Sequence, residues 1–80
     1  MKRDNIFKDL EEIFRTIFDD ETINLCNETT AADIEDWDSL EQINLIVAIE
    51  HKYNIKFNIA DVGAMRNVGD MVDAILKRVS

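Results

Sequence analysis

Ser39 is the residue whose chemistry stands out first, because it lies between an acid, Asp38, and the apolar Leu40. Catalysis by a serine hydroxyl needs a nearby base. The one histidine, His51, follows twelve residues later, and it would lie near the opposite end of the same helix. Cys26 is the one cysteine, so we predict neither a disulfide nor a catalytic cysteine–histidine pair. We expect its thiol to be partly buried in a loop. We therefore predict no catalytic residue in this chain.

The acidic residues before Ser39 raise the possibility of a metal site. An EF-hand needs oxygen ligands at alternating positions, then a glycine and a distant glutamate. A loop starting at Asp33 has Trp37 at a ligand position, a loop starting at Asp36 has Leu40 there, and neither contains a glycine. One cysteine and one histidine are too few for a zinc site. We predict no specific metal site, and weak cation binding by the acids stays open.

A helix from about residue 38 to residue 52 must position Ser39. Asp38 is the predicted N-cap of this helix, and Glu41, three residues later, completes a capping-box pattern. Its apolar residues form two stripes, Leu45, Ile46, Ile49 and Tyr53 on one face and Leu40, Ile43 and Val47 nearly opposite. Either the second stripe is exposed beside Ser39, or this is a central helix buried on both sides. Periodicity alone leaves both interpretations open.

The net charge of −8 is unevenly distributed. Nine acids and no Lys or Arg occur from Asp19 to Glu41, whereas the other eight acids are nearly balanced by all nine basic residues. Such a chain is a poor nucleic-acid ligand, because phosphate binding needs a basic face. The acidic stretch is either a solubilising loop or a field that steers basic protein surfaces towards Ser39.

The length predicts one domain, residues 1–80, which is too small to enclose a deep active-site cleft. Proline is absent, glycine occurs twice, and no alternating run of strand length is present, so we predict an all-α four-helix bundle. The helices are expected at about residues 4–18, 38–52, 59–65 and 68–79, with a long connection over 19–37. The expected caps of the other three are Asp4, Asn58 and Asn67, the last in a box with Asp70.

The apolar residues between and within these helices should form the core. The first helix is expected to bury Ile6, Phe7, Leu10, Ile13, Phe14, Ile17 and Phe18, and the last helix Val68, Met71, Val72, Ile75 and Val79. Ile23, Leu25 and Ile34 should pin the long connection, and Trp37 should anchor its end. Tyr53, Ile55 and Phe57 should face inward from the next connection, and Ile59 and Val62 from the short third helix.

The tripeptide Asp38-Ser39-Leu40, preceded by acids and followed by an amphipathic helix ending in Ala48-Ile49-Glu50, resembles the acyl carrier proteins. The resemblance covers essentially the whole chain, including the four-helix pattern, the long first loop and the short third helix. It implies that a transferase attaches 4′-phosphopantetheine to Ser39 and that the thiol of this arm carries acyl groups as thioesters between enzymes.

The resemblance also implies roles for neighbouring residues. Asp38 matches the family's acid beside the serine, Leu40, Ile43 and Val47 match partner-facing apolar positions, and Glu41 and Glu50 match acidic recognition positions. The implied partners are the transferase and acyl-loading and acyl-processing enzymes with basic docking surfaces. Ser39 would be an attachment point, so the chain would not be an enzyme.

Some residues depart from the pattern of carriers in fatty acid synthesis. Asn44, His51 and Lys52 stand where such members carry acids, Asp61 is the one acid in the third-helix segment, and Trp37 occupies a position that is often small. These departures favour a specialised carrier for a polyketide or a lipid modification. Fatty acid synthesis and an aminoacyl or peptidyl carrier are alternatives.

Two other classes of protein are alternatives to a carrier. A helical interaction adaptor would use the Leu40, Ile43 and Val47 stripe to bind a partner groove, and Ser39 would then be only a helix-start residue. An acidic nucleic-acid mimic would need its charge spread over a face, whereas here it is concentrated in one stretch. No apolar run is long enough for a signal-peptide core or a membrane span, so we expect a cytoplasmic monomer.

Overall fold

Four α-helices form the structure, a computed structural model that describes residues 2–79. They are α1 (Arg3–Ile17), α2 (Ser39–Tyr53), α3 (Ile59–Gly63) and α4 (Val68–Val79), with a short 3-10 turn at Ala31–Asp33 in the first connection. No strand occurs within the described residues. The predicted all-α bundle with a long first loop and a short third helix is confirmed.

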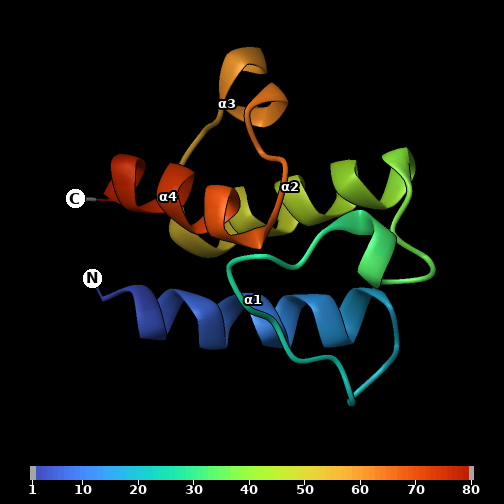
Figure 1. The fold of residues 1–80 in the computed structure, drawn as a ribbon. Coiled ribbons are helices and arrows are strands. Elements are labelled where there is room, and N and C mark those ends of the chain that lie inside the picture. Colours follow the sequence, from blue (N-terminus) through green and yellow to red (C-terminus); the bar gives the residue numbers. More distant parts are fainter. Residues whose placement is uncertain (1, 80) are drawn as a thin grey trace.

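Helix α1 provides the base of the core. Its apolar residues recur every three or four positions, so Ile6, Leu10 and Phe14 share one face and are fully buried. This face packs against both α2 and α4, and α3 lies on the far side of those two helices (Figure 1). The bundle therefore has α2 and α4 as its middle layer.

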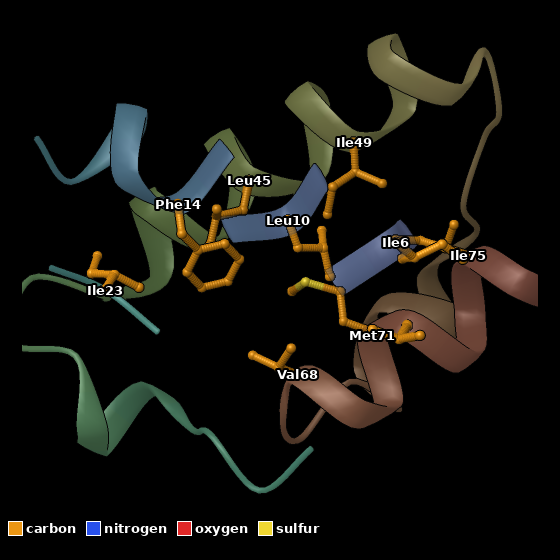
Figure 2. Close-up of a cluster of buried hydrophobic side chains, with 10 residues drawn as sticks. Ile6, Leu10, Phe14, Ile23, Leu45, Ile49, Val68, Met71 and Ile75 are labelled. Carbon is orange, nitrogen blue, oxygen red and sulfur yellow. The ribbon is translucent and has the colours of Figure 1, made fainter. Parts of the chain in front are cut away.

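Three helices and the first connection contribute to the core. Figure 2 shows Leu10 and Phe14 of α1 converging with Leu45 of α2 and Met71 of α4. The buried apolar residues are Ile6, Leu10, Phe14, Ile23, Leu45, Ile49, Val68, Met71, Val72 and Ile75. Most of the predicted core is confirmed, although Phe7, Ile13, Ile17, Phe18 and Val79 pack only half-buried at its edge.

The long connection after α1 is fixed to the bundle at several points. Ile23 is buried and Leu25 and Ile34 are half-buried against the core, as predicted. Its backbone also meets the start of α4, where the Val68 N–H donates to the Thr29 carbonyl at 2.9 Å and the Gly69 N–H donates to the Asn27 carbonyl at 3.0 Å. The connection is therefore held along its length before it reaches α2.

Gly69 is required where α4 meets this connection. A Cβ at residue 69 would lie 2.9 Å from the Asn27 carbonyl oxygen, closer than atoms normally approach. We predict that Gly69→Ala lowers the free energy of unfolding by about 1–3 kcal/mol, because backbone must move to admit the methyl group. Gly63→Ala is the control, since nothing lies within 4 Å of a Cβ there. Denaturant titration should show no loss for the control; equal stability of the two variants would contradict the prediction.

Several local predictions were wrong. Lys2, not Asp4, is the N-cap of α1, so Asp4 lies within the first turn and makes no cap hydrogen bond. Helix α3 ends at Gly63, two residues early, and its first residue, Ile59, is 92% exposed rather than inward. The physical reason is that α3 is a short outer element remote from α1, so its first residue has no core to enter (Figure 1).

Two further residues differ from expectation. Cys26 is exposed rather than partly buried, with its thiol 3.4 Å from the Thr29 hydroxyl. Tyr53 is the last residue of α2 rather than part of the next connection, and its hydroxyl donates to Asp9 Oδ2 at 2.5 Å. Partial burial and this carboxylate both raise the pKa of Tyr53. The pair joins the C-terminal end of α2 to α1.

Candidate functional site

Ser39 is the first residue of α2 and is exposed. Its predecessor Asp38 is the N-cap, in extended backbone, and Asp38 Oδ1 accepts the Glu41 N–H at 2.9 Å. The carboxylate of Asp38 therefore performs the capping that a serine side chain could otherwise perform. Within residues 2–79 the Ser39 hydroxyl has no hydrogen-bond partner. The hydroxyl is left available for chemistry with another molecule.

The predicted capping box at this helix start is only half formed. Glu41 does not reach back to the Asp38 N–H; its Oε1 instead accepts from the Asn44 side-chain amide at 2.7 Å. Residues 41 and 44 lie one turn apart on the same helix face, which makes this contact available. Separately, the N–H groups of Ser39 and Leu40 belong to the first turn of α2, where no intrahelical carbonyl can accept from them, and they have no acceptor in the part of the chain that the structure describes.

The Asp38 cap should be measurable in stability. We predict that Asp38→Ala lowers the free energy of unfolding by about 1 kcal/mol (range 0.5–2), because the Glu41 N–H loses its acceptor. Asp38→Asn keeps an acceptor oxygen and should stay close to wild type in chemical denaturation. If Asp38→Asn were as unstable as Asp38→Ala, the carboxylate would matter through its charge rather than as the cap.

Trp37 fixes the backbone that enters α2. Its ring meets that of Phe14 edge-on, with centroids 5.1 Å apart, and its Nε1 donates to Gln42 Oε1 at 2.7 Å. The first contact ties residue 37 to the core through α1, and the second ties it to the next turn of α2. Trp37 is thus the anchor that the sequence predicted, and it sets the position of Asp38 and Ser39.

The second apolar stripe of α2 faces outward. Leu40, Ile43 and Val47 are 65%, 60% and 52% exposed, whereas Leu45 and Ile49 on the opposite face are fully buried. The alternative of a helix buried on both sides is therefore wrong. An exposed apolar stripe beside an exposed hydroxyl is a feature that marks interaction surfaces.

The two acidic residues predicted for recognition already have partners within the chain. Glu41 accepts from Asn44, as described above. Glu50 is half-buried, and its Oε2 accepts the Phe57 N–H at 2.8 Å. The carboxylate of Glu50 therefore holds the connection after α2, and its role in partner recognition stays a prediction.

A groove of about 600 Å³ opens beside Ser39. It is lined by Ala31, Trp37, Asp38, Ser39, Gln42, Ile43, Val62, Met65 and Arg66. The sequence did not indicate a role for Gln42 of α2, and it did not predict that Met65 and Arg66 lie beside Ser39, because no periodicity relates the residues after α3 to the start of α2. Only the folded chain brings these two segments to the same groove.

The site contains no arrangement for independent catalysis. His51 is exposed and lies in the last turn of α2, whereas Ser39 begins that helix. Among the described residues, no three His, Cys, Asp or Glu side chains are grouped so as to hold a metal ion. None of the described helices is both long and apolar enough to cross a membrane. What the site offers is a free hydroxyl, an apolar stripe and an adjoining groove.

Known proteins resemble this chain in both sequence and structure. Residues 8–75 match the family described as "Phosphopantetheine attachment site". The solution NMR structure of holo acyl carrier protein from Geobacter metallireducens is similar to this chain with a TM-score of 0.87 and 45% sequence identity, covering 91% of this chain and 84% of that one. No curated sequence matches the chain.

Proposed function

This chain belongs to the acyl carrier protein family, and from that membership we propose that Ser39 carries the prosthetic group and that the chain shuttles acyl groups between biosynthetic enzymes. The chain is a carrier protein that bears covalent 4′-phosphopantetheine, and it is not an enzyme. The observation that carries the proposal is the exposed Ser39 hydroxyl, which has no hydrogen-bond partner among residues 2–79.

The residues at the start of α2 fit a phosphodiester on Ser39. The N–H groups of Ser39 and Leu40 have no acceptor within the described residues, and a helix N-terminus favours negative charge. Asp38 already satisfies the Glu41 N–H, so the helix start does not depend on the Ser39 hydroxyl. When bound, the group supplies a flexible thiol that forms thioesters with acyl groups.

The role of Ser39 in acquiring the group follows from its surroundings. Its Oγ would form the new bond to phosphorus while adenosine bisphosphate leaves from coenzyme A, and its proton would go to a base. No described side chain hydrogen-bonds this hydroxyl, so we assign that base to the transferase. The chain's own contribution is to present the hydroxyl on a rigid, capped helix.

The test is modification of the purified, unmodified protein. Incubation with coenzyme A and a broad-specificity phosphopantetheinyl transferase should add the mass of one phosphopantetheine group. A known carrier protein, treated in parallel, controls for transferase activity. Protein that stays unmodified while the control is fully converted would contradict the proposal.

We also assign the partner surface to the exposed stripe Leu40, Ile43 and Val47, together with the acids around Ser39. The stripe is more than half exposed, and nine acids without a basic residue occur from Asp19 to Glu41. Apolar contacts would supply affinity, and the acidic field would steer enzymes with basic docking surfaces. Glu41 and Glu50 would contribute to this field while keeping their intramolecular contacts.

Salt should separate these two contributions. We predict that raising the salt from 0.1 M to 1 M slows association with the transferase by roughly 10-fold, because the screening length falls from about 10 Å to about 3 Å. Ile43→Ala should weaken binding at both salt concentrations, since it removes apolar contact and no charge. Surface plasmon resonance measures both effects. Association that does not respond to salt would show that the apolar stripe dominates.

The departures from fatty-acid carriers bear on the pathway. Asn44 is bound to Glu41 on the partner surface, and His51 and Lys52 are exposed on the last turn of α2. We propose a specialised carrier, for a polyketide or a modified lipid, with fatty acid synthesis as the alternative and an aminoacyl cargo ranked last. The intact mass of protein purified from its native host would identify the cargo. The single domain over 1–80, the monomeric state and the cytoplasmic location stay predictions.

A further inference from the structure

Arg66 differs from the other three arginines of the chain in having no partner for its side chain. Arg3 bonds Asp73 and Asn27, Arg15 bonds the Ile23 carbonyl, and Arg78 bonds Asp61. The Arg66 guanidinium has no hydrogen bond or ion pair within residues 2–79, and only its backbone N–H is engaged, donating to Asp70 Oδ2 at 3.1 Å. One exposed guanidinium is therefore free.

The free guanidinium lines the groove beside Ser39. Arg66 and Asp38 are the two charged residues among the nine that line it, and Arg66 is its one cation. The chain segment on the Ser39 side has no other cation, since no Lys or Arg occurs from residue 19 to residue 41. Arg66 thus brings a positive charge close to Ser39, whereas all the charged residues of the segment from residue 19 to residue 41 are acidic.

Attachment of a phosphodiester would add a further negative charge at this place. Repulsion from the surrounding acids would disfavour it unless a cation lies within reach. A guanidinium suits a phosphate because it is always charged and can donate two parallel hydrogen bonds to two oxygens. Gln42 lines the same groove, but its side-chain amide is neutral and cannot provide the charge.

We propose that the guanidinium of Arg66 pairs with the phosphodiester of the arm attached to Ser39 and holds that arm against the groove. The inference rests on the proposed function, because it assumes that Ser39 carries the group. Arg66 is then a positioning residue, which touches the phosphate and takes no part in forming thioesters. The unmodified protein keeps this cation free, and modification gives it a partner.

The experiment compares unmodified and phosphopantetheinylated forms of wild type, Arg66→Gln, Arg66→Lys and Lys56→Gln, all without an acyl group. Lys56→Gln is the matched control, because it removes one positive charge from an exposed residue that lines a different pocket. For each variant the difference in Tm between modified and unmodified protein is measured, together with the ³¹P chemical shift of the modified protein.

The measured quantity is the Tm of the modified form minus the Tm of the unmodified form. In Arg66→Gln this difference should be about 2–4 °C lower than in wild type or in Lys56→Gln. The effect should shrink at 1 M salt, and the ³¹P resonance should move only in the Arg66 variants. Arg66→Lys should retain part of the Tm difference, since the charge remains without the paired geometry.

The outcomes separate this inference from the proposed function. If no variant acquires phosphopantetheine, the proposed function fails. If all are modified but Arg66→Gln behaves like Lys56→Gln in Tm and ³¹P shift, the proposed function stands and the Arg66 pairing is overturned. Loss of modification in Arg66→Gln alone would assign Arg66 to the transferase contact and would also overturn the pairing.

Discussion

Replacement of Ser39 by alanine is expected to abolish phosphopantetheine transfer and to leave the fold intact. Transfer should fall below detection, because the substitution removes the oxygen that forms the bond to phosphorus. Stability should change by less than about 0.5 kcal/mol, because residue 39 is exposed and Asp38 caps the helix. Intact-protein mass spectrometry measures the transfer, and denaturant titration measures the stability.

The sequence offers a matched control for this substitution. Ser80 is the only other serine in the chain, so Ser80→Ala removes the same oxygen elsewhere. It should be modified to the same extent as wild type. Modification of Ser39→Ala, or loss of modification in Ser80→Ala, would show that Ser39 is not the attachment residue.

Replacement of Phe14 by alanine is expected to have the largest effect on stability. Phe14 is fully buried and its ring contacts Phe18 and Trp37. Removing a buried phenylalanine costs about 3–5 kcal/mol, against a total of about 5–15 kcal/mol for a typical domain. Because Trp37 is the only tryptophan, its fluorescence should report the loosened junction before Ser39. Guanidinium titration followed by this fluorescence measures both effects.

Two further variants keep the Phe14 prediction testable. Phe14→Leu leaves part of the side chain in place and should cost about 1–1.5 kcal/mol, so it gives a value even if Phe14→Ala does not fold. Ile59→Ala truncates an apolar side chain that is 92% exposed, and it should change stability by less than about 0.5 kcal/mol. Equal losses for Phe14→Leu and Ile59→Ala would contradict the assignment of the core.

The helices that carry strong local signals could be predicted from the sequence. Asn67 Oδ1 accepts the Asp70 N–H, and α4 begins and ends where predicted. The predicted box with Asp70 is not formed, because the Asp70 carboxylate accepts the Arg66 N–H instead. Asp38 likewise marks the start of α2, and the two-stripe pattern of that helix became one buried and one exposed face. The capping interactions join residues within a turn of one another, so capping rules were sufficient to place the two helix starts. Periodicity identified the two stripes of α2 but left open whether the second is exposed, because that depends on packing against other helices.

The features that were missed depend on residues distant in the sequence. Nothing local indicates that Arg66 shares a groove with Ser39, or that Tyr53 bonds Asp9 across α1 and α2. Ile59 is an apolar residue on an outer helix, and only the arrangement of the helices in layers reveals that its side chain is exposed. The incomplete capping box of α2 is the exception, because it involves a local contact: Glu41 accepts from Asn44, three residues away, instead of from the Asp38 N–H.

The location of phosphopantetheine on the modified protein tests the central claim most directly. Trypsin should release residues 16–52 as one fragment, because no Lys or Arg lies between Arg15 and Lys52, and Ser39 is the only serine within it. Tandem mass spectrometry of this fragment should assign the added group to Ser39. Assignment to a threonine or to Cys26, or to any other tryptic fragment, would contradict the claim that the helix start presents the attachment hydroxyl.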